Sequence, residues 1–216
     1  MTQAISKKRY HFFLLITFLC VFWWSAIGPY DFYTWLLEVI PTVIGTIILL
    51  SIYRKFQFTN LVYTLIWIHM IILVIGGHYT YARVPLGNWV RDWLELTRNN
   101  YDRLGHFVQG FIPAMIAREV FLKKSPLKPG GWLFFIVTCF CLGFSAFFEL
   151  FEWWVALLSG SSADAFLATQ GDVWDTQWDM FLALCGSLIA QITLSKFHDK
   201  SLSFKISKSP NTDDSR

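Results

Sequence analysis

Residues 132–152 read WLFFIVTCFCLGFSAFFELFE, an uncharged run of seventeen residues followed by a segment that contains Glu149 and Glu152. As an α-helix, the uncharged part alone covers roughly 25 Å of a bilayer core that is about 30 Å thick. A carboxylate inside such a segment costs on the order of 2.5–3.5 kcal/mol on insertion scales, so it needs a partner, a proton, a metal or water. This stretch therefore predicts a membrane-spanning helix that carries part of a polar site.

The composition extends this prediction to the whole chain. Of 216 residues, 55% are hydrophobic and only 15% are charged, whereas soluble domains average about 25% charged residues. Most basic residues flank apolar segments, so the net charge of +3 indicates contact with the lipid bilayer and gives no indication of nucleic-acid binding. The four cysteines all lie in apolar segments, which supports neither a disulfide framework nor a thiolate metal site.

Apolar segments recur along the chain and predict an all-α, polytopic membrane bundle of about six transmembrane helices. A short interfacial helix is expected in the loop before the fourth span, where Trp89, Trp93 and Leu96 share one face. Thirteen Lys and Arg residues fall on one side of the spans and four on the other, which predicts that both termini are cytoplasmic. Residues 1–200 are predicted to form a single transmembrane domain, and 201–216 a disordered cytoplasmic tail. The expected spans are 10–30, 35–53, 56–82, 104–122, 132–158 and 180–195.

The fourth expected span is the least apolar. His106 lies at its start, and Arg118 and Glu119 lie near its end. Charged groups are rare in helices that face lipid, so this helix is expected to pack inside the bundle. Arg118 and Glu119 are expected to pair with Arg54 or Lys55, or with another helix.

Asp, Glu and His side chains of several spans are predicted to meet at the outer membrane face. Asp102 and His106 are four residues apart, and Glu149 and Glu152 are three apart, so each pair can face one cavity. So many carboxylates cannot all ionise in a low-dielectric site without a cation, an arginine or bound protons. A divalent metal held by carboxylate oxygen and imidazole is one such cation, and Arg103 is the candidate within the chain. The candidate catalytic residues are Glu149, Glu152, His106 and Asp102, the candidate substrate-binding residues are Arg103, His78 and Asp172, and the candidate metal ligands are Asp175, Asp179 and His106.

Each of these groups also has a structural interpretation. Asp102 can cap a helix, and His106 can be a satisfied interfacial histidine. Asp172 and Asp175 can be solvated first-turn residues that the helix dipole favours. Glu149 and its neighbouring glutamate can join helices through hydrogen bonds or salt bridges.

Four motifs carry a resemblance to a known family: GHYTY at 77–81, NYDRLGH at 100–106, ELFEW at 149–153 and GDVWDTQWDM at 171–180. In these motifs the chain resembles the YjdF-type bacterial inner-membrane proteins over nearly its whole length. The resemblance implies a multi-pass protein of the bacterial inner (plasma) membrane whose activity is not established. A more distant similarity is to VanZ-like membrane proteins, which share an Asp and a His that open one helix and a glutamate in a later one.

Three functions are compatible with this pattern. The first is an intramembrane enzyme or binding protein that acts on a lipid-linked or cell-envelope substrate at the outer leaflet, with a divalent metal as candidate cofactor. The second is a small proton-coupled transporter, and the third is a non-catalytic structural or partner-binding membrane protein. The sequence contains no H-E-x-x-H, G-x-S-x-G or P-loop signature, so it leaves open whether the chain is an enzyme. It also leaves the oligomeric state open.

Overall fold

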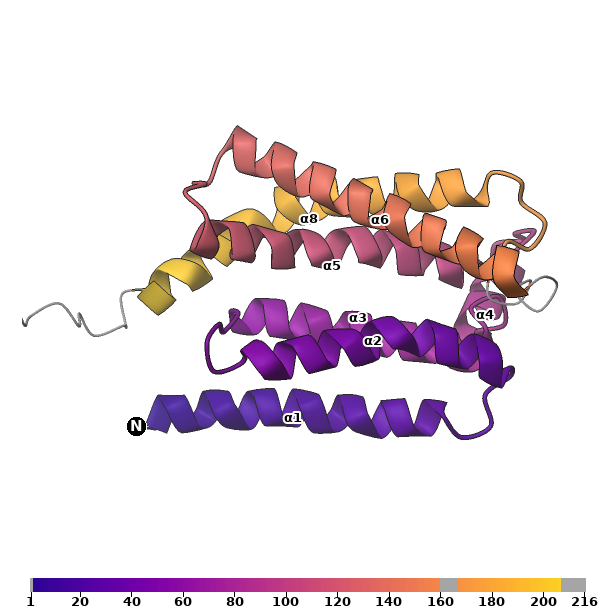
Figure 1. Cartoon of the computed structure of the whole chain (residues 1–216), viewed down its shortest axis with the longest axis horizontal. Coiled ribbons are helices and arrows are strands. Elements are labelled where there is room, and N and C mark those ends of the chain that lie inside the picture. Colours follow the sequence, from indigo (N-terminus) through magenta and orange to yellow (C-terminus); the bar gives the residue numbers. More distant parts are fainter. Residues whose placement is uncertain (1, 160–166, 207–216) are drawn as a thin grey trace, which may run out of the picture.

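The computed structural model describes residues 2–159 and 167–206, and every regular element within these ranges is an α-helix. Long helices run side by side, and the short helix α4 lies at one end of them (Figure 1). The helices are α1 (Thr2–Ser25), α2 (Phe32–Ile52), α3 (Asn60–Tyr79), α4 (Pro85–Trp93), α5 (Tyr101–Lys124), α6 (Gly131–Ser159) and α8 (Asp175–Ile206).

The last helix is longer than the sixth expected span. It begins at Asp175, before the expected start of that span, and continues to Ile206. The division into a transmembrane domain and a tail after residue 200 stays a prediction, and residues 207–216 of the predicted tail lie outside the described residues. The expected short helix is present as α4, where Pro85 suits the first helical position and Leu96 lies beyond the end.

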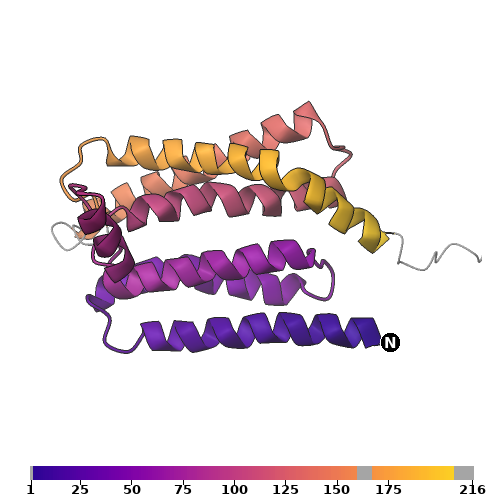
Figure 2. The same cartoon turned by 180° about the vertical axis from the view of Figure 1, so that it is seen from behind.

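Within the described ranges, four helices, α2, α3, α6 and α8, are long and apolar enough to cross a membrane. The helices α1 and α5 are each 24 residues long, which corresponds to about 36 Å of helix, but they are not among these four. The first turn of α1 and the last described turn of α8 lie at the same end of the bundle, together with the α2–α3 and α5–α6 connections (Figure 2).

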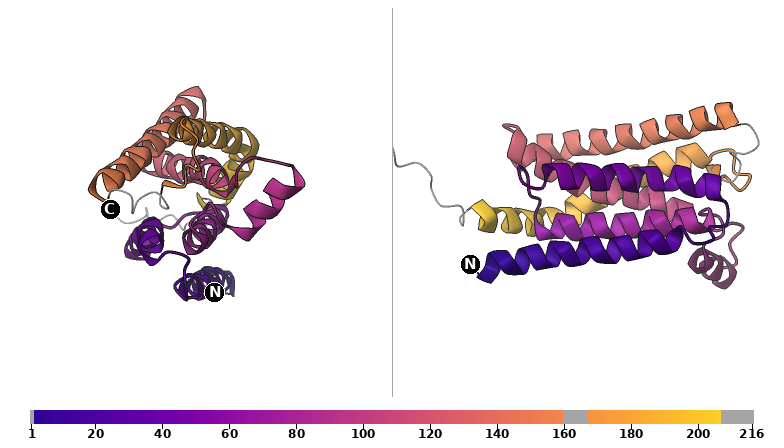
Figure 3. Two further views of the ribbon diagram at one scale, coloured as in Figure 1. Left: turned by 90° about the vertical axis from the view of Figure 1, so that its right-hand side faces the viewer. Right: turned by 60° about the horizontal axis from the view of Figure 1, so that its bottom comes forward.

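Helix α5 lies at the centre of the bundle and packs against α3, α6 and α8 (Figure 3, left). Its buried residues include Asp102 and His106 near its start, and Arg118 and Glu119 near its end. The fourth expected span corresponds to α5. The prediction that it packs inside the bundle is therefore confirmed, since the polar side chains of α5 contact other helices.

Glycines fix the close approach of α5 and α8. A Cβ atom on Gly110 would lie 1.8 Å from the carbonyl oxygen of Ala183, and one on Gly186 would lie 2.1 Å from the carbonyl oxygen of Phe107. Backbone atoms cannot move away cheaply, so only glycine fits at either position. The start of α8 is thereby held against the start of α5, where the acidic side chains are.

Side-chain caps define where α2 and α3 begin. The Asp31 carboxylate accepts a hydrogen bond from the backbone N–H of Thr34 at 2.7 Å, and the Thr59 hydroxyl accepts one from the N–H of Val62 at 3.4 Å. Each cap satisfies a donor that has no partner within the first helical turn. The hydrogen bonds from Thr34 lower the pKa of the Asp31 carboxyl.

Candidate functional site

The outer acidic cluster, defined as Asp102, His106, Glu149, Asp175 and Asp179, comes from three helices. Asp102 and His106 lie one turn apart at the start of α5, as do Asp175 and Asp179 at the start of α8. Glu149 lies about two-thirds of the way along α6. All five residues are less than one tenth exposed. Charged groups from separate parts of the chain are thus buried together.

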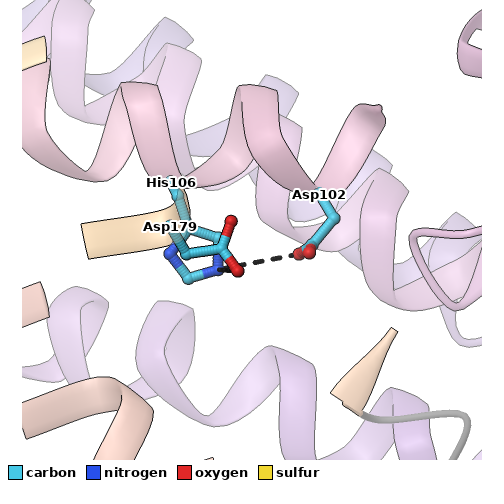
Figure 4. Close-up of side chains that lie close together, drawn as sticks. All are labelled: Asp102, His106 and Asp179. Carbon is cyan, nitrogen blue, oxygen red and sulfur yellow. Dashed lines mark ion pairs between the residues drawn. The ribbon is translucent and has the colours of Figure 1, made fainter. Parts of the chain in front are cut away.

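His106 lies among three of these carboxylates. Its Nε2 atom is 3.7 Å from Asp102 Oδ1 and 3.9 Å from Asp179 Oδ2, and Figure 4 shows both carboxylates beside the ring. Its Nδ1 atom is 3.6 Å from Glu149 Oε1. All three distances exceed those of a hydrogen bond between nitrogen and oxygen. The two ring nitrogens therefore face different groups, without a direct hydrogen bond to these three carboxylates.

Among the described residues, three buried polar atoms of the cluster have no hydrogen-bond partner. They are His106 Nδ1, Glu149 Oε1 and Asp179 Oδ1. Nearly all buried polar groups in proteins have a partner, so three exceptions in one place call for an explanation. A ligand that offers positive charge would satisfy the two carboxylate oxygens.

The donors suit a divalent metal ion. Asp102, His106 and Asp179 each offer one ligand atom, and these atoms lie within 4.8 Å of one another. Two ligands about 2.1 Å from a tetrahedral metal are roughly 3.4 Å apart, close to the 3.7 and 3.9 Å separations from Nε2. Mixed carboxylate and imidazole ligands are typical of zinc, manganese and iron sites.

A buried arginine that the sequence analysis did not select neutralises part of the cluster. Arg98 hydrogen-bonds to Asp175 through Nη1, and its guanidinium lies 3.7 Å from Asp172 and 3.9 Å from Asp102. A further hydrogen bond of 3.3 Å runs from Nη2 to the carbonyl oxygen of Ala168. Arg98 precedes α5 in a connecting segment, so its spacing of four residues from Asp102 is no helix signal, and the sequence gives no indication of this role.

Arg103, the counter-ion expected from the sequence, lies nearer the surface. Its Nη2 atom is 2.5 Å from Asp172 Oδ2, and both side chains are about a quarter exposed. The guanidinium also lies 5.4 Å from the ring centroid of Trp178. Arg103 and Asp172 thus lie at the rim of the outer acidic cluster, whereas Arg98 is buried against it.

His78 is not part of the cluster. Its Nδ1 atom is 2.9 Å from the carbonyl oxygen of Ser25, and its ring centroid lies 4.6 Å from that of Trp24. The helix α3 directs this histidine toward the end of α1, so the structure does not bring it together with the other candidate site residues.

A cavity of about 400 Å³ begins beside the cluster and runs along α5 between α2, α3 and α6. Its polar end is formed by Asp102, His106, Glu152 and Glu38, a residue that the sequence analysis left out of the site. The remaining wall is mostly apolar and reaches Val120. We call this cavity the central groove. Glu152 lines the central groove, whereas Glu149 lies beside His106, so the two glutamates occupy different positions.

A second buried polar cluster lies at the other end of the bundle. Glu119 accepts hydrogen bonds from Thr59 and Lys123 and lies 3.0 Å from His198 Nε2. Arg118 forms two hydrogen bonds with Asp199, at 2.7 and 3.1 Å. The expected pairing with another helix is confirmed, and the observed partners come from α8, from α5 itself and from the cap of α3.

The contacts of this second cluster also determine which ring nitrogen of His198 carries the proton. Arg118 Nη1 is 2.8 Å from His198 Nδ1, and a guanidinium can only donate. Nδ1 is therefore the acceptor, so His198 is neutral and its Nε2–H donates to Glu119. This complete set of partners is typical of a structural network.

Comparison with known proteins identifies relatives along most of the chain. It is 48% identical over 187 residues to "Inner membrane protein YjdF" of Escherichia coli (strain K12), an alignment that covers 87% of this chain and 90% of that protein. No solved structure matches the chain. The family model described as "Predicted membrane protein (DUF2238)" matches residues 10–200. The chain therefore belongs to the DUF2238 family of predicted membrane proteins.

Proposed function

We propose that this inner-membrane protein has six spanning helices, α1, α2, α3, α5, α6 and α8, and that both of its termini lie in the cytoplasm. The relative from E. coli is named as an inner-membrane protein. Lys7, Lys8 and Arg9 lie at the same end of the bundle as Arg54 and Lys55, which supports this orientation. The exposed Trp89 and Trp93 of α4 support its placement at the outer interface.

For the activity, we propose that the outer acidic cluster binds a divalent metal ion and acts on a lipid-linked substrate at the outer leaflet. The observation that carries this proposal is His106, which lies among three carboxylates at the polar end of an apolar groove. Two of these carboxylates, Glu149 and Asp179, have a buried oxygen without a hydrogen-bond partner among the described residues. Acidic side chains around the site outnumber the two arginines Arg98 and Arg103 by five, and a divalent ion would reduce this excess of negative charge. The acidic side chains are those of Glu38, Asp102, Glu149, Glu152, Asp172, Asp175 and Asp179.

The two sides of the His106 ring suggest a division of roles. Asp102 and Asp179 face Nε2 and would share the metal with it. Glu149 faces Nδ1, the position of the carboxylate that orients a metal-binding histidine. Glu152 lies at the groove instead, where it is the candidate general acid or base.

The central groove supports a lipid as the substrate class. Its lining on α5 extends from Asp102 to Val120, a rise of about 27 Å along the helix axis. Its volume of about 400 Å³ lies within the range of ligand pockets, roughly 300–1,000 Å³. A ligand in this groove would have its chain among apolar residues and its polar end at the metal.

The metal content of the purified protein tests this proposal. In lipid nanodiscs, we expect about one divalent ion per chain by elemental mass spectrometry. His106→Ala and Asp179→Asn should abolish it, whereas His78→Ala, a histidine at the same end that is outside the cluster, should retain it. Equal metal content in all four proteins would refute the metal site.

The bound lipid tests the substrate class. A large residue at Gly45, which lines the central groove, should displace co-purified lipid without removing the metal. Gly45→Phe fills the apolar part of the groove, and its matched control Gly143→Phe adds the same side chain where no atom lies within 4 Å of the new Cβ. Unchanged lipid content in Gly45→Phe would contradict the proposal.

A further inference from the structure

A second cavity lies outside the proposed active site and shares three lining residues, Leu49, Ile66 and Met70, with the central groove. It also has a volume of about 400 Å³ and is bounded by α1, α2 and α3. Ile66 and Tyr63 of α3 form its buried floor, and Phe12 and Leu50, on α1 and α2, are exposed at its edges. We call it the α1–α2 groove.

The height of the α1–α2 groove matches one leaflet of a bilayer. Along α1 its lining runs from Lys8 to Phe18, a rise of about 15 Å along the helix axis. The hydrocarbon core is about 30 Å thick, so the groove spans half of it. It begins at the end of the bundle that holds the first turn of α1 and closes at the level of Phe18.

The charge at the mouth of the α1–α2 groove is positive. Lys8 and His11 line this end, and no acidic residue is among the described residues that form the wall. Tyr53 also lines it, and its hydroxyl lies 2.9 Å from His11 Nδ1. The exposed side chains of Arg9 and Arg54 follow in the sequence. The central groove, by contrast, has carboxylates at its polar end, at the other end of the bundle.

We propose that the α1–α2 groove binds one anionic phospholipid of the cytoplasmic leaflet, with its acyl chains against Ile66 and Phe12 and its phosphate at Lys8. Lysine binds a phosphate as a point charge, and a basic pocket between transmembrane helices on the cytoplasmic side is a recognised site for anionic head groups. The site does not depend on the proposed outer metal site, and variants of the two sites should behave independently.

Native mass spectrometry of the full chain tests this proposal. The protein is released from nanodiscs of equal dioleoyl phosphatidylglycerol and dioleoyl phosphatidylcholine, and the retained lipid is identified. We expect one phosphatidylglycerol per chain to be retained preferentially. Lys8→Gln should weaken this retention about fivefold, whereas Lys128→Gln, which removes a lysine in the α5–α6 connection, should leave it unchanged.

A variant that fills the α1–α2 groove tests the role of its shape separately from the role of its charge. Thr46→Phe fills the groove and should abolish retention, whereas Ile47→Phe, on the adjacent exposed face of α2, should not. Asp179→Asn should retain the lipid even if it loses the metal. The proposal is overturned if the two lysine variants weaken retention equally, if Thr46→Phe retains the lipid, if phosphatidylcholine is retained equally well, or if a second copy of the chain occupies the groove.

Discussion

Replacing Arg98 by glutamine tests whether the outer acidic cluster depends on one buried guanidinium. Arg98 hydrogen-bonds to Asp175, lies within 4 Å of Asp172 and Asp102, and has a side chain that is 9% exposed. Removal of one partner of a buried ion pair costs about 3–5 kcal/mol, because the other charge stays buried without a counter-ion. We expect Arg98→Gln to lower the free energy of unfolding by about that amount.

Arg103→Gln is the matched control, because Arg103 pairs with Asp172 at the rim and is 24% exposed. Its loss should lower the free energy of unfolding by about 1 kcal/mol or less. The double variant Arg98→Gln, Asp175→Asn should recover part of the stability, because it also removes the charge left unpaired. The assay is reversible unfolding in mixed micelles, followed by tryptophan fluorescence. Equal losses for the two arginine variants, or wild-type stability of Arg98→Gln, would refute the reasoning.

Three further predictions concern stability and use the same unfolding assay. Gly186→Val should cost about 1–3 kcal/mol because it separates α5 from α8, whereas Gly143→Val, which has open space at its Cβ, should be much milder. Glu119→Gln should cost roughly 1–3 kcal/mol because it leaves buried donors poorly matched, and an equal effect of the exposed Glu95→Gln would argue against this. Asp31→Ala should cost about 1 kcal/mol through the lost cap. Because the pKa of Asp31 is lowered, this difference should be complete above the ordinary aspartate pKa of about 3.9 and should shrink as the pH falls through the lowered pKa; a difference independent of pH would contradict it.

The helical architecture could be predicted from the sequence because several apolar segments, those of α2, α3, α6 and α8, are long enough to cross a bilayer by themselves. The spacing of Asp102 and His106 likewise fixes their common helix face without any tertiary information. The end of α8 could not be located in the same way. Lys196, His198 and Asp199 look like the end of a membrane segment, but the helix continues and His198 contacts Glu119.

The membership of the candidate site depends on tertiary contacts, which the residue types do not reveal. Arg98 lies before α5 in a connecting segment, and only the fold of that segment against Ala168 and Asp175 buries it. His78 was expected at the site because it ends α3 on the same side. The rotation of α3 about its own axis, which packing determines, directs it to Trp24 instead.

Anomalous scattering from crystals grown with cobalt(II) would locate the metal ion that His106, Asp102 and Asp179 are proposed to share. We expect one strong anomalous peak about 2.0–2.2 Å from His106 Nε2 and from a carboxylate oxygen of each aspartate, with Glu149 on the Nδ1 side of the ring. A map with no peak there, in which these side chains pair with one another or point apart, would refute the shared metal ion.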